Sequence, residues 1–239
     1  MVTYSSKYRS TAPEIMDSFE LQGEEMKFLL TDLKTINTYL GGTSVTLDGL
    51  KVLLRSHPKD RLVTIVDMGC GDGEILRSCA AFAEENNYRF QLIGVDANSH
   101  ILKEARIRSG KHSSITFLEL DVFSEAMQKI ECDIVLCTLF LHHFSRNDII
   151  KLLTNCVHNA KVGVIINDLH RSRWAFWLFG IFSRLFINTR TARHDGLVSI
   201  ARGFKRKDIK NMQKHFPNTE QRVRWKWAFR YQWIIKSNK

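Results

Sequence analysis

Residues 64–73, Thr-Ile-Val-Asp-Met-Gly-Cys-Gly-Asp-Gly, decide the fold of this chain. An apolar run leads to an acid, Asp67, and three glycines follow at alternate positions: Gly69, Gly71 and Gly73. A buried strand that ends in such a turn and opens into a helix forms a cradle for a nucleotide cofactor. Glycine permits the sharp turn and leaves no Cβ between the backbone and a ligand.

The spacing of this loop distinguishes between cofactors. The dinucleotide fingerprint is G-x-G-x-x-G, with a pyrophosphate at the helix N-terminus, but Glu74 stands where that fingerprint needs its third glycine. Asp67 would repel a pyrophosphate, whereas it would attract a cationic ligand and accept from an ammonium group. S-adenosylmethionine carries a sulfonium and an amino acid head but no phosphate. The loop therefore favours S-adenosylmethionine over NAD.

Two further acids follow at the ends of expected strands. Residues 91–96 are predicted to form a strand that ends in Asp96, 23 positions after Gly73. An acid about 20 residues beyond the glycine loop binds ribose hydroxyls in such folds. A third acid, Asp121, closes the next predicted strand, residues 115–122.

With these residues in place, the chain resembles class I S-adenosylmethionine-dependent methyltransferases over residues 60–170. The resemblance implies S-adenosyl-L-methionine as cofactor and S-adenosyl-L-homocysteine as product. It implies that the methionine end of the cofactor lies on the glycine loop and the ribose on the second acid. The implied cofactor-binding residues are Asp67, Gly69, Gly71 and Gly73 in the loop, Asp96 and Ala97 at the ribose, Asp121 and Val122 at the adenine, and Cys137 and Thr138 on the fourth strand.

Strand and helix patterns alternate between residues 61 and 168, which predicts βαβ units in a parallel sheet. Residues 223–235 alternate with a period of two around a break near Ala228, which indicates a hairpin. The resemblance implies that this hairpin completes a seven-stranded, mostly parallel Rossmann-like α/β sheet with one antiparallel strand and helices on both faces. We expect one domain, 1–239, that comprises a helical N-terminal segment (1–58, opening on a flexible lead), a cofactor-binding core (59–170), a helical insertion (171–204) and a C-terminal helix and hairpin (205–239).

The bulk composition limits the class of protein. Neither a signal peptide nor an apolar stretch of about 20 residues is found, so no transmembrane segment is expected. The five cysteines include no C-x-x-C pair, so we expect no metal site and a cytoplasmic, reducing location. Residues 170–239 contain seventeen Lys and Arg and three acids, a net charge of +14, which leaves −4 for the rest of the chain. This uneven charge would favour the binding of an acidic partner to the C-terminal third.

Three histidine settings are candidates for chemistry. His142 and His143 follow the fourth strand, where we expect a structural or cofactor-wall role. His170 ends the fifth strand, a position that can face a substrate. His194 lies in the insertion beside Asp195, which could orient it. The candidate catalytic residues are therefore His170, His194 and Asp195, each weighed against a hydrogen-bonded turn residue.

The segments 8–17, 37–42, 167–171 and 193–196 are similar to those of a bacterial methyltransferase group associated with aromatic polyketide and aryl-polyene pigment pathways. That resemblance implies secondary metabolism and a phenolic or polyketide-derived small molecule, methylated on a hydroxyl or an activated carbon. The aromatic insertion is compatible with a helix packed on the sheet or in a homodimer, with a substrate lid, or with a membrane-surface helix.

Two other functions are compatible with the basic C-terminal third. One is methylation of RNA or another nucleic acid, but the fourth-strand end has no Asx-Pro-Pro motif of base-amine methylation, so nucleic acid is disfavoured. The other is a methyltransferase, or a non-catalytic subunit, that binds an acidic carrier protein. The sequence is compatible with methylation of an oxygen, carbon or nitrogen atom.

Overall fold

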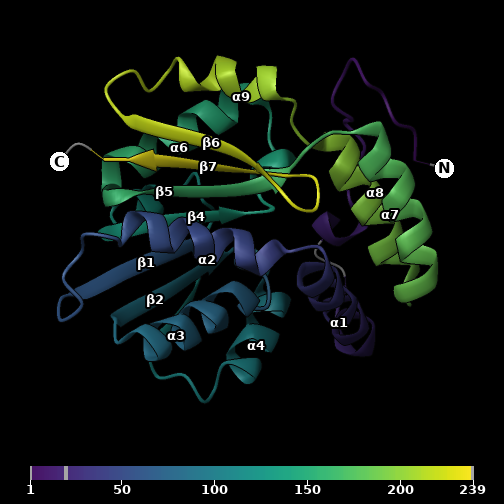
Figure 1. The fold of residues 1–239 in the computed structure, drawn as a ribbon. Coiled ribbons are helices and arrows are strands. Elements are labelled where there is room, and N and C mark those ends of the chain that lie inside the picture. Colours follow the sequence, from purple (N-terminus) through teal and green to yellow (C-terminus); the bar gives the residue numbers. More distant parts are fainter. Residues whose placement is uncertain (1, 19–20, 238–239) are drawn as a thin grey trace.

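The described part of the chain, residues 2–18 and 21–237 of this computed structural model, is built on a seven-stranded sheet in the order β3-β2-β1-β4-β5-β7-β6 (Figure 1). Only β7 runs antiparallel to its neighbours, so the predicted mostly parallel sheet is confirmed. The strands are β1 (Leu62–Met68), β2 (Arg89–Asp96), β3 (Ile115–Glu119), β4 (Cys132–Thr138), β5 (Ala160–Leu169), β6 (Glu220–Lys226) and β7 (Arg230–Lys236).

Helices cover both faces of the sheet because its central strands are apolar on both sides. In β1, Ile65 packs with α2, α3 and α4 on one face, whereas Val66 packs with α6 and α9 on the other. The helices are η1 (Ile15–Ser18), α1 (Gly23–Tyr39), α2 (Gly42–Leu53), α3 (Glu74–Asn86), α4 (Ser99–Arg108), α5 (Glu125–Gln128), η2 (Leu141–His143), α6 (Arg146–Asn159), α7 (Arg173–Phe186), α8 (Arg190–Arg202) and α9 (Arg206–Gln213).

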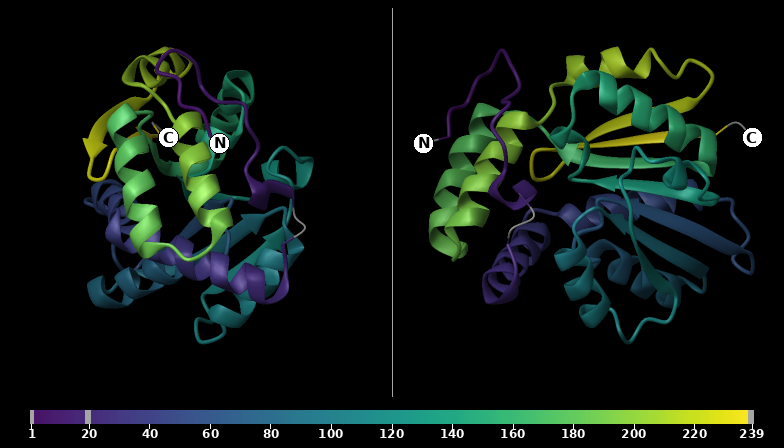
Figure 2. Two further views of the ribbon diagram at one scale, coloured as in Figure 1. Left: turned by 90° about the vertical axis from the view of Figure 1, so that its right-hand side faces the viewer. Right: turned by 180° about the vertical axis from the view of Figure 1, so that it is seen from behind.

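A third apolar cluster joins α1 to the helical insertion, α7 and α8, at one end of the sheet (Figure 2). Ser172 and Thr189 cap the two insertion helices by accepting from the amides of Ala175 and Ala192. The helices pack closely at Gly196, where a Cβ would lie 2.2 Å from the ring of Phe179. The insertion is therefore helical, as the sequence predicts, and it stands over the carboxyl ends of the parallel strands.

The C-terminal hairpin turns where the sequence predicts a break. Strand β6 ends at Lys226, β7 begins at Arg230, and the turn between them contains Ala228. Strand β3 is shorter than predicted, because it is an edge strand whose pairing with β2 ends at the pair Asp96 and Glu119. Within the described residues, no helix combines the length and the apolar character needed to cross a bilayer.

The start of the chain does not match the expectation of a flexible lead. The amide of Ser10 donates to the carbonyl of Ala201 at 3.0 Å, and the guanidinium of Arg9 lies 4.7 Å from the ring of Phe204. Arg171, which is 2 % exposed, donates to the carbonyls of Ser5 and Ser6. Residues 2–18 are thus held on the C-terminal third by contacts that local sequence does not encode.

Candidate functional site

A cavity of about 840 Å³ opens where the carboxyl ends of the parallel strands face α1, α7 and α8. Carboxylates from the glycine loop and the ends of β2 and β3 line one part of it, and apolar side chains of the three helices line another. Ligands bind at this edge of open α/β sheets, because the loops that follow the strands converge there. The cavity therefore defines the candidate site.

The three loop glycines all have positive φ, at +66°, +53° and +76° for Gly69, Gly71 and Gly73. A Cβ on Gly69 would lie 2.2 Å from the ring of Phe140, and one on Gly73 would lie 2.7 Å from Phe117. Gly71 has open space at that position and lines the cavity. Gly69 and Gly73 are thus required by close packing, whereas Gly71 leaves the backbone accessible to a ligand.

Asp67 is a buried acid with an unsatisfied oxygen at the cavity. Its side chain is 2 % exposed, and Oδ1 has no hydrogen-bond partner among the residues that the structure describes. Burial, together with the nearby charge of Asp96, raises the pKa of Asp67 to about 8. A cationic group bound beside this carboxylate would offset the free-energy cost of burying its negative charge. These properties are compatible with the predicted contact between Asp67 and the ammonium group of S-adenosylmethionine, which stays a prediction.

The second acid is fixed by the backbone around it. The amides of Gly71 and Asn98 both donate to the carboxylate of Asp96 at 3.0 Å. Burial raises the pKa of Asp96 above its usual range, although these amides oppose the rise. A carboxylate held in this way retains lone pairs for a diol, so Asp96 and the adjacent Ala97, which also lines the cavity, fit a ribose.

The remaining predicted cofactor residues are divided between the cavity and the core. Asp121, Val122 and Thr138 line the cavity, and the hydroxyl of Thr138 lies 2.9 Å from that of Thr46. Cys137 is fully buried in the core on the opposite face of β4, because adjacent strand residues point to opposite sides. Cys137 and Gly73 thus lie outside the cavity lining, and eight of the ten predicted residues lie in it.

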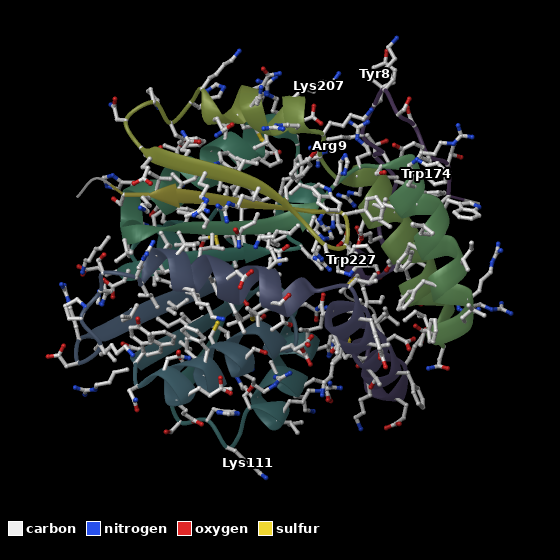
Figure 3. All side chains as sticks on the ribbon, viewed as in Figure 1. Tyr8, Arg9, Lys111, Trp174, Lys207 and Trp227 are labelled. Atoms are coloured by element: carbon white, nitrogen blue, oxygen red, sulfur yellow. The ribbon has the colours of Figure 1, made fainter. Side chains whose placement is uncertain are left out.

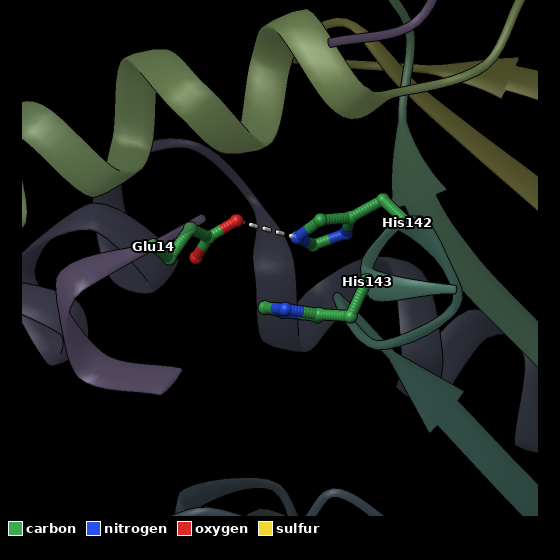
Figure 4. A group of neighbouring side chains, drawn as sticks. All are labelled: Glu14, His142 and His143. Atoms are coloured by element: carbon green, nitrogen blue, oxygen red, sulfur yellow. Dashed lines mark ion pairs between the residues drawn. The ribbon is translucent and has the colours of Figure 1, made fainter. Parts of the chain in front are cut away.

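A buried charge cluster lies beside the cofactor cradle (Figure 4). His142 is 2 % exposed, with Nδ1 2.8 Å from Asp168 Oδ1 and Nε2 3.3 Å from Glu14 Oε1. Burial alone would lower the pKa of His142, but the two carboxylates raise it to about 9. The same contacts lower the pKa of Glu14 and of Asp168 against the effect of their burial. His142 is therefore an imidazolium held between two carboxylates.

His143, the next residue, faces the cavity. Its Nδ1 lies 3.2 Å from Oδ1 of Asp17. The other carboxylate oxygen of Asp17, Oδ2, lies 3.4 Å from the guanidinium of Arg202. Nitrogen and oxygen atoms of Glu14, His142 and His143 lie within 4.8 Å of one another, a spacing compatible with a metal ion. Carboxylates lie against both ring nitrogens of His142, so the same arrangement also fits a proton held between Glu14, His142 and Asp168.

The three predicted catalytic residues are not brought together at the cavity. His170 and His194 lie outside its lining. The indole of Trp225 donates to His170 Nδ1 at 3.3 Å, and burial lowers the pKa of His170. Asp195 lines the cavity, but its carboxylate accepts from the amides of Ile15 and Met16 at the start of η1 and contacts His194.

Several lining residues were not predicted from the sequence. Glu14 and Asp17 come from the N-terminal segment, and Asn37 in α1 donates to Glu74 at 3.2 Å. Arg230, at the start of β7, is 1 % exposed, and burial lowers its pKa to about 10. The resemblance singled out the segments 8–17 and 37–42, but no local pattern assigned these side chains to a cavity, because their partners lie far away along the chain.

The profile of a family described as "Methyltransferase domain" matches residues 65–163. No curated protein was found to match the sequence. Among solved structures, the plantazolicin methyltransferase BamL, in complex with a triazolic desmethylPZN analog and SAH, has a TM-score of 0.69 at 13 % identity over 93 % of this chain and 94 % of its own.

Two further structures have the same fold. Magnesium protoporphyrin IX methyltransferase (ChlM) from Synechocystis PCC 6803, with bound SAH, has a TM-score of 0.54 at 16 % identity over 92 % of this chain and 91 % of its own. The CMeT domain of the citrinin polyketide synthase has a TM-score of 0.58 at 13 % identity over 81 % of this chain and 52 % of its own. At 13–16 % identity, these three likenesses show the fold alone.

Proposed function

We propose that this chain is an S-adenosylmethionine-dependent methyltransferase, a function that the family match over residues 65–163 supports, and that it methylates a hydroxyl or an activated carbon of a lipophilic phenolic or polyketide-derived small molecule. The observation that carries the proposal is the continuity of one cavity. The acids and glycines of the cradle line it together with Leu33 and Ile36 of α1, Phe179 and Phe182 of α7 and Ile200 of α8. An apolar acceptor bound among these side chains would lie next to the cofactor.

The apolar walls favour the reaction itself. S-adenosylmethionine supplies a methyl group on a sulfonium, and charge is neutralised as that group is transferred. A site that excludes water and fixes its dipoles in advance stabilises such a change better than solvent does. Apolar side chains of α1, α7 and α8 line the cavity on the side away from the sheet, so they would displace water around a bound acceptor.

His143 is the residue that we assign to proton removal from the acceptor. Its Nδ1 lies 3.2 Å from Asp17, and a ring hydrogen on Nδ1 donated to that carboxylate would leave Nε2 as the proton acceptor. A phenolic hydroxyl or an acidic carbon needs such a base during transfer, whereas an amine that is already neutral does not. We propose no direct role for His170 or His194, because neither lines the cavity.

The His142 cluster would position this base. The guanidinium of Arg202 donates to the carbonyls of both His142 and His143, and Arg9 donates to that of His142 at 2.8 Å. The ring of His142 is fixed by Asp168, and Glu14 joins it to the N-terminal segment. These contacts hold η2, and therefore His143, in one orientation at the cavity.

The ligands of the structural neighbours agree with a small acceptor. Their names and complexes refer to desmethylPZN analogs and to magnesium protoporphyrin IX, and both are small-molecule or peptide natural products. An apolar cavity of about 840 Å³ has the size range of drug-sized ligand pockets.

A panel of phenols with alkyl tails of increasing length tests the proposal. We expect turnover to rise with tail length, and Leu33→Trp to raise KM for long tails more than for short ones. We expect His143→Gln to lower kcat by about 10²–10⁴-fold while S-adenosylhomocysteine still binds. Methylation of RNA, or of a carrier-bound but not a free acceptor, would contradict the proposal.

A further inference from the structure

Five large apolar side chains are exposed along one face of α7. Trp174, Trp177, Leu178, Ile181 and Leu185 are 68, 57, 44, 39 and 71 % exposed. At about 100° per residue, they form a continuous stripe along the helix, which we call the outer face of α7. The opposite side of the helix packs through Ala175, Phe179 and Ser183. The stripe therefore has no partner within the described residues.

This outer face borders the mouth of the cavity. Leu178, Ile181 and Leu185 belong both to the stripe and to the cavity lining. Phe186 and Trp227, which also line the cavity, are 56 and 67 % exposed. Figure 3 places Trp227 at the hairpin bend, close to α7, and Trp174 near the start of that helix. The entrance to an apolar cavity is thus surrounded by apolar surface that faces solvent.

The exposed Asp, Glu, Lys and Arg side chains of α7 and α8 are all arginines. Helix α7 contains no acid, and the acid of α8, Asp195, is 2 % exposed. Arg173, Arg184 and Arg190 are exposed, and none of them forms a salt bridge with a described residue. A surface that combines exposed tryptophans and leucines with unpaired arginines is complementary to an anionic, apolar layer.

We infer that the outer face of α7 docks on the surface of an anionic lipid bilayer, so that the mouth of the cavity faces the lipid. An amphipathic helix with aromatic and aliphatic residues on one side and arginines beside them lies in the plane of the interface. Tryptophan favours the headgroup depth that Trp174 and Trp177 would reach. A helix of 14 residues cannot span the bilayer, so the contact would be peripheral.

Other occupants fit this surface less well. In a two-fold symmetric dimer through the outer face, the unpaired Arg173 and Arg184 of both copies would meet without acids between them. A nucleic acid would pair with the arginines but leave the apolar stripe exposed to water. The inference goes beyond the proposed methylation, because it depends on this surface and not on the acceptor.

Cosedimentation with vesicles tests the inference on the full-length protein. The probes are phosphatidylcholine vesicles with and without about one quarter phosphatidylglycerol, at low and high salt. We expect binding to the anionic vesicles that weakens with salt, and its loss in Trp174→Glu/Trp177→Glu. We expect Arg173→Glu/Arg184→Glu to weaken binding by at least the about fivefold that one basic residue contributes.

A matched control separates this face from general surface polarity. Leu62 and Ile107 are 47 and 66 % exposed, and they lie on β1 and α4, away from α7. Leu62→Glu/Ile107→Glu is expected to bind vesicles like the wild type. Neither Trp174 nor Trp177 lines the cavity, so unchanged S-adenosylhomocysteine affinity verifies that their double variant is folded.

Three results would overturn the inference. One is no sedimentation with anionic vesicles at low salt, and another is an equal loss in the Leu62/Ile107 control. The third is a stable dimer, a nucleic acid complex or an acidic carrier complex that depends on Trp174 and Trp177 while vesicles stay unbound. None of these results bears on the proposed methylation, because no acceptor is used.

Discussion

Replacing Asp67 by asparagine tests the charge of the cofactor cradle. Asp67 is buried, one of its oxygens is unpartnered, and burial with the charge of Asp96 raises its pKa to about 8. At pH 7, about nine-tenths of ligand-free molecules would therefore carry a proton on this carboxyl. An ammonium group bound there favours the ionised form. Binding of S-adenosylhomocysteine at pH 7 should therefore release about 0.9 proton, and affinity should rise by up to about tenfold per pH unit below pH 8.

Calorimetric titration in buffers of different ionisation enthalpy measures that proton. In Asp67→Asn, the release should disappear, and affinity at pH 8 should fall by about 10–150-fold, the value of a hydrogen bond between charged groups of about 1.5–3 kcal/mol. Asp96→Asn is the matched control, because Asp96 already accepts from two backbone amides. If proton release persists in Asp67→Asn, or is absent in the wild type, Asp67 is not the group that loses a proton when the ligand binds.

The same residue predicts the pH dependence of stability without ligand. Its folded pKa lies above its ordinary value of 3.8, so the folded state holds the proton that the unfolded state has lost. Stability should therefore fall as pH rises from about 4 to 8, by up to about 6 kcal/mol. Urea unfolding across this range should show a smaller fall for Asp67→Asn than for the wild type.

Two further positions give separable outcomes. Gly69→Ala should cost about 2–5 kcal/mol in urea unfolding, because φ is +66° and the new methyl would lie 2.2 Å from the ring of Phe140. Gly71→Ala should cost only about 1–2 kcal/mol yet lower S-adenosylhomocysteine affinity, since its methyl meets nothing within 4 Å and enters the cavity; equal unfolding costs would contradict this. In the folded protein the pKa of His142 is about 9, above its ordinary value of 6.5. The protonated ring should therefore add about 3 kcal/mol to the free energy of unfolding below pH 6.5. This contribution should fade as pH rises through 9, and it should be absent from His142→Asn.

The sheet could be predicted because its signals are local. Apolar runs that end in Asp67, Asp96 and Asp121, with the glycine loop after the first, determine both the strands and the edge where they converge. The break near Ala228 follows from a period of two that is too long for one strand. In each case, neighbouring residues carry the information.

The rest of the site depends on contacts between distant segments. Glu14 and His142 are separated by 128 positions, so their pairing exists only once the N-terminal segment has packed on α8. His170 follows β5 but is turned toward Trp225 of β6, a direction that no local pattern determines. Of the two residues predicted on the fourth strand, β4 directs Cys137 into the core and Thr138 toward the cavity, an alternation that the resemblance alone did not resolve.

Transfer of a labelled methyl group is the most direct test of whether this chain methylates a lipophilic small molecule. The purified chain is incubated with methyl-labelled S-adenosylmethionine and a total bacterial extract, which is then divided into organic-soluble, nucleic acid and protein fractions. The account predicts label in the organic-soluble fraction, and its loss with Asp96→Ala and with His143→Gln. Label in the nucleic acid or protein fraction, or organic-soluble label that both variants retain, would contradict it.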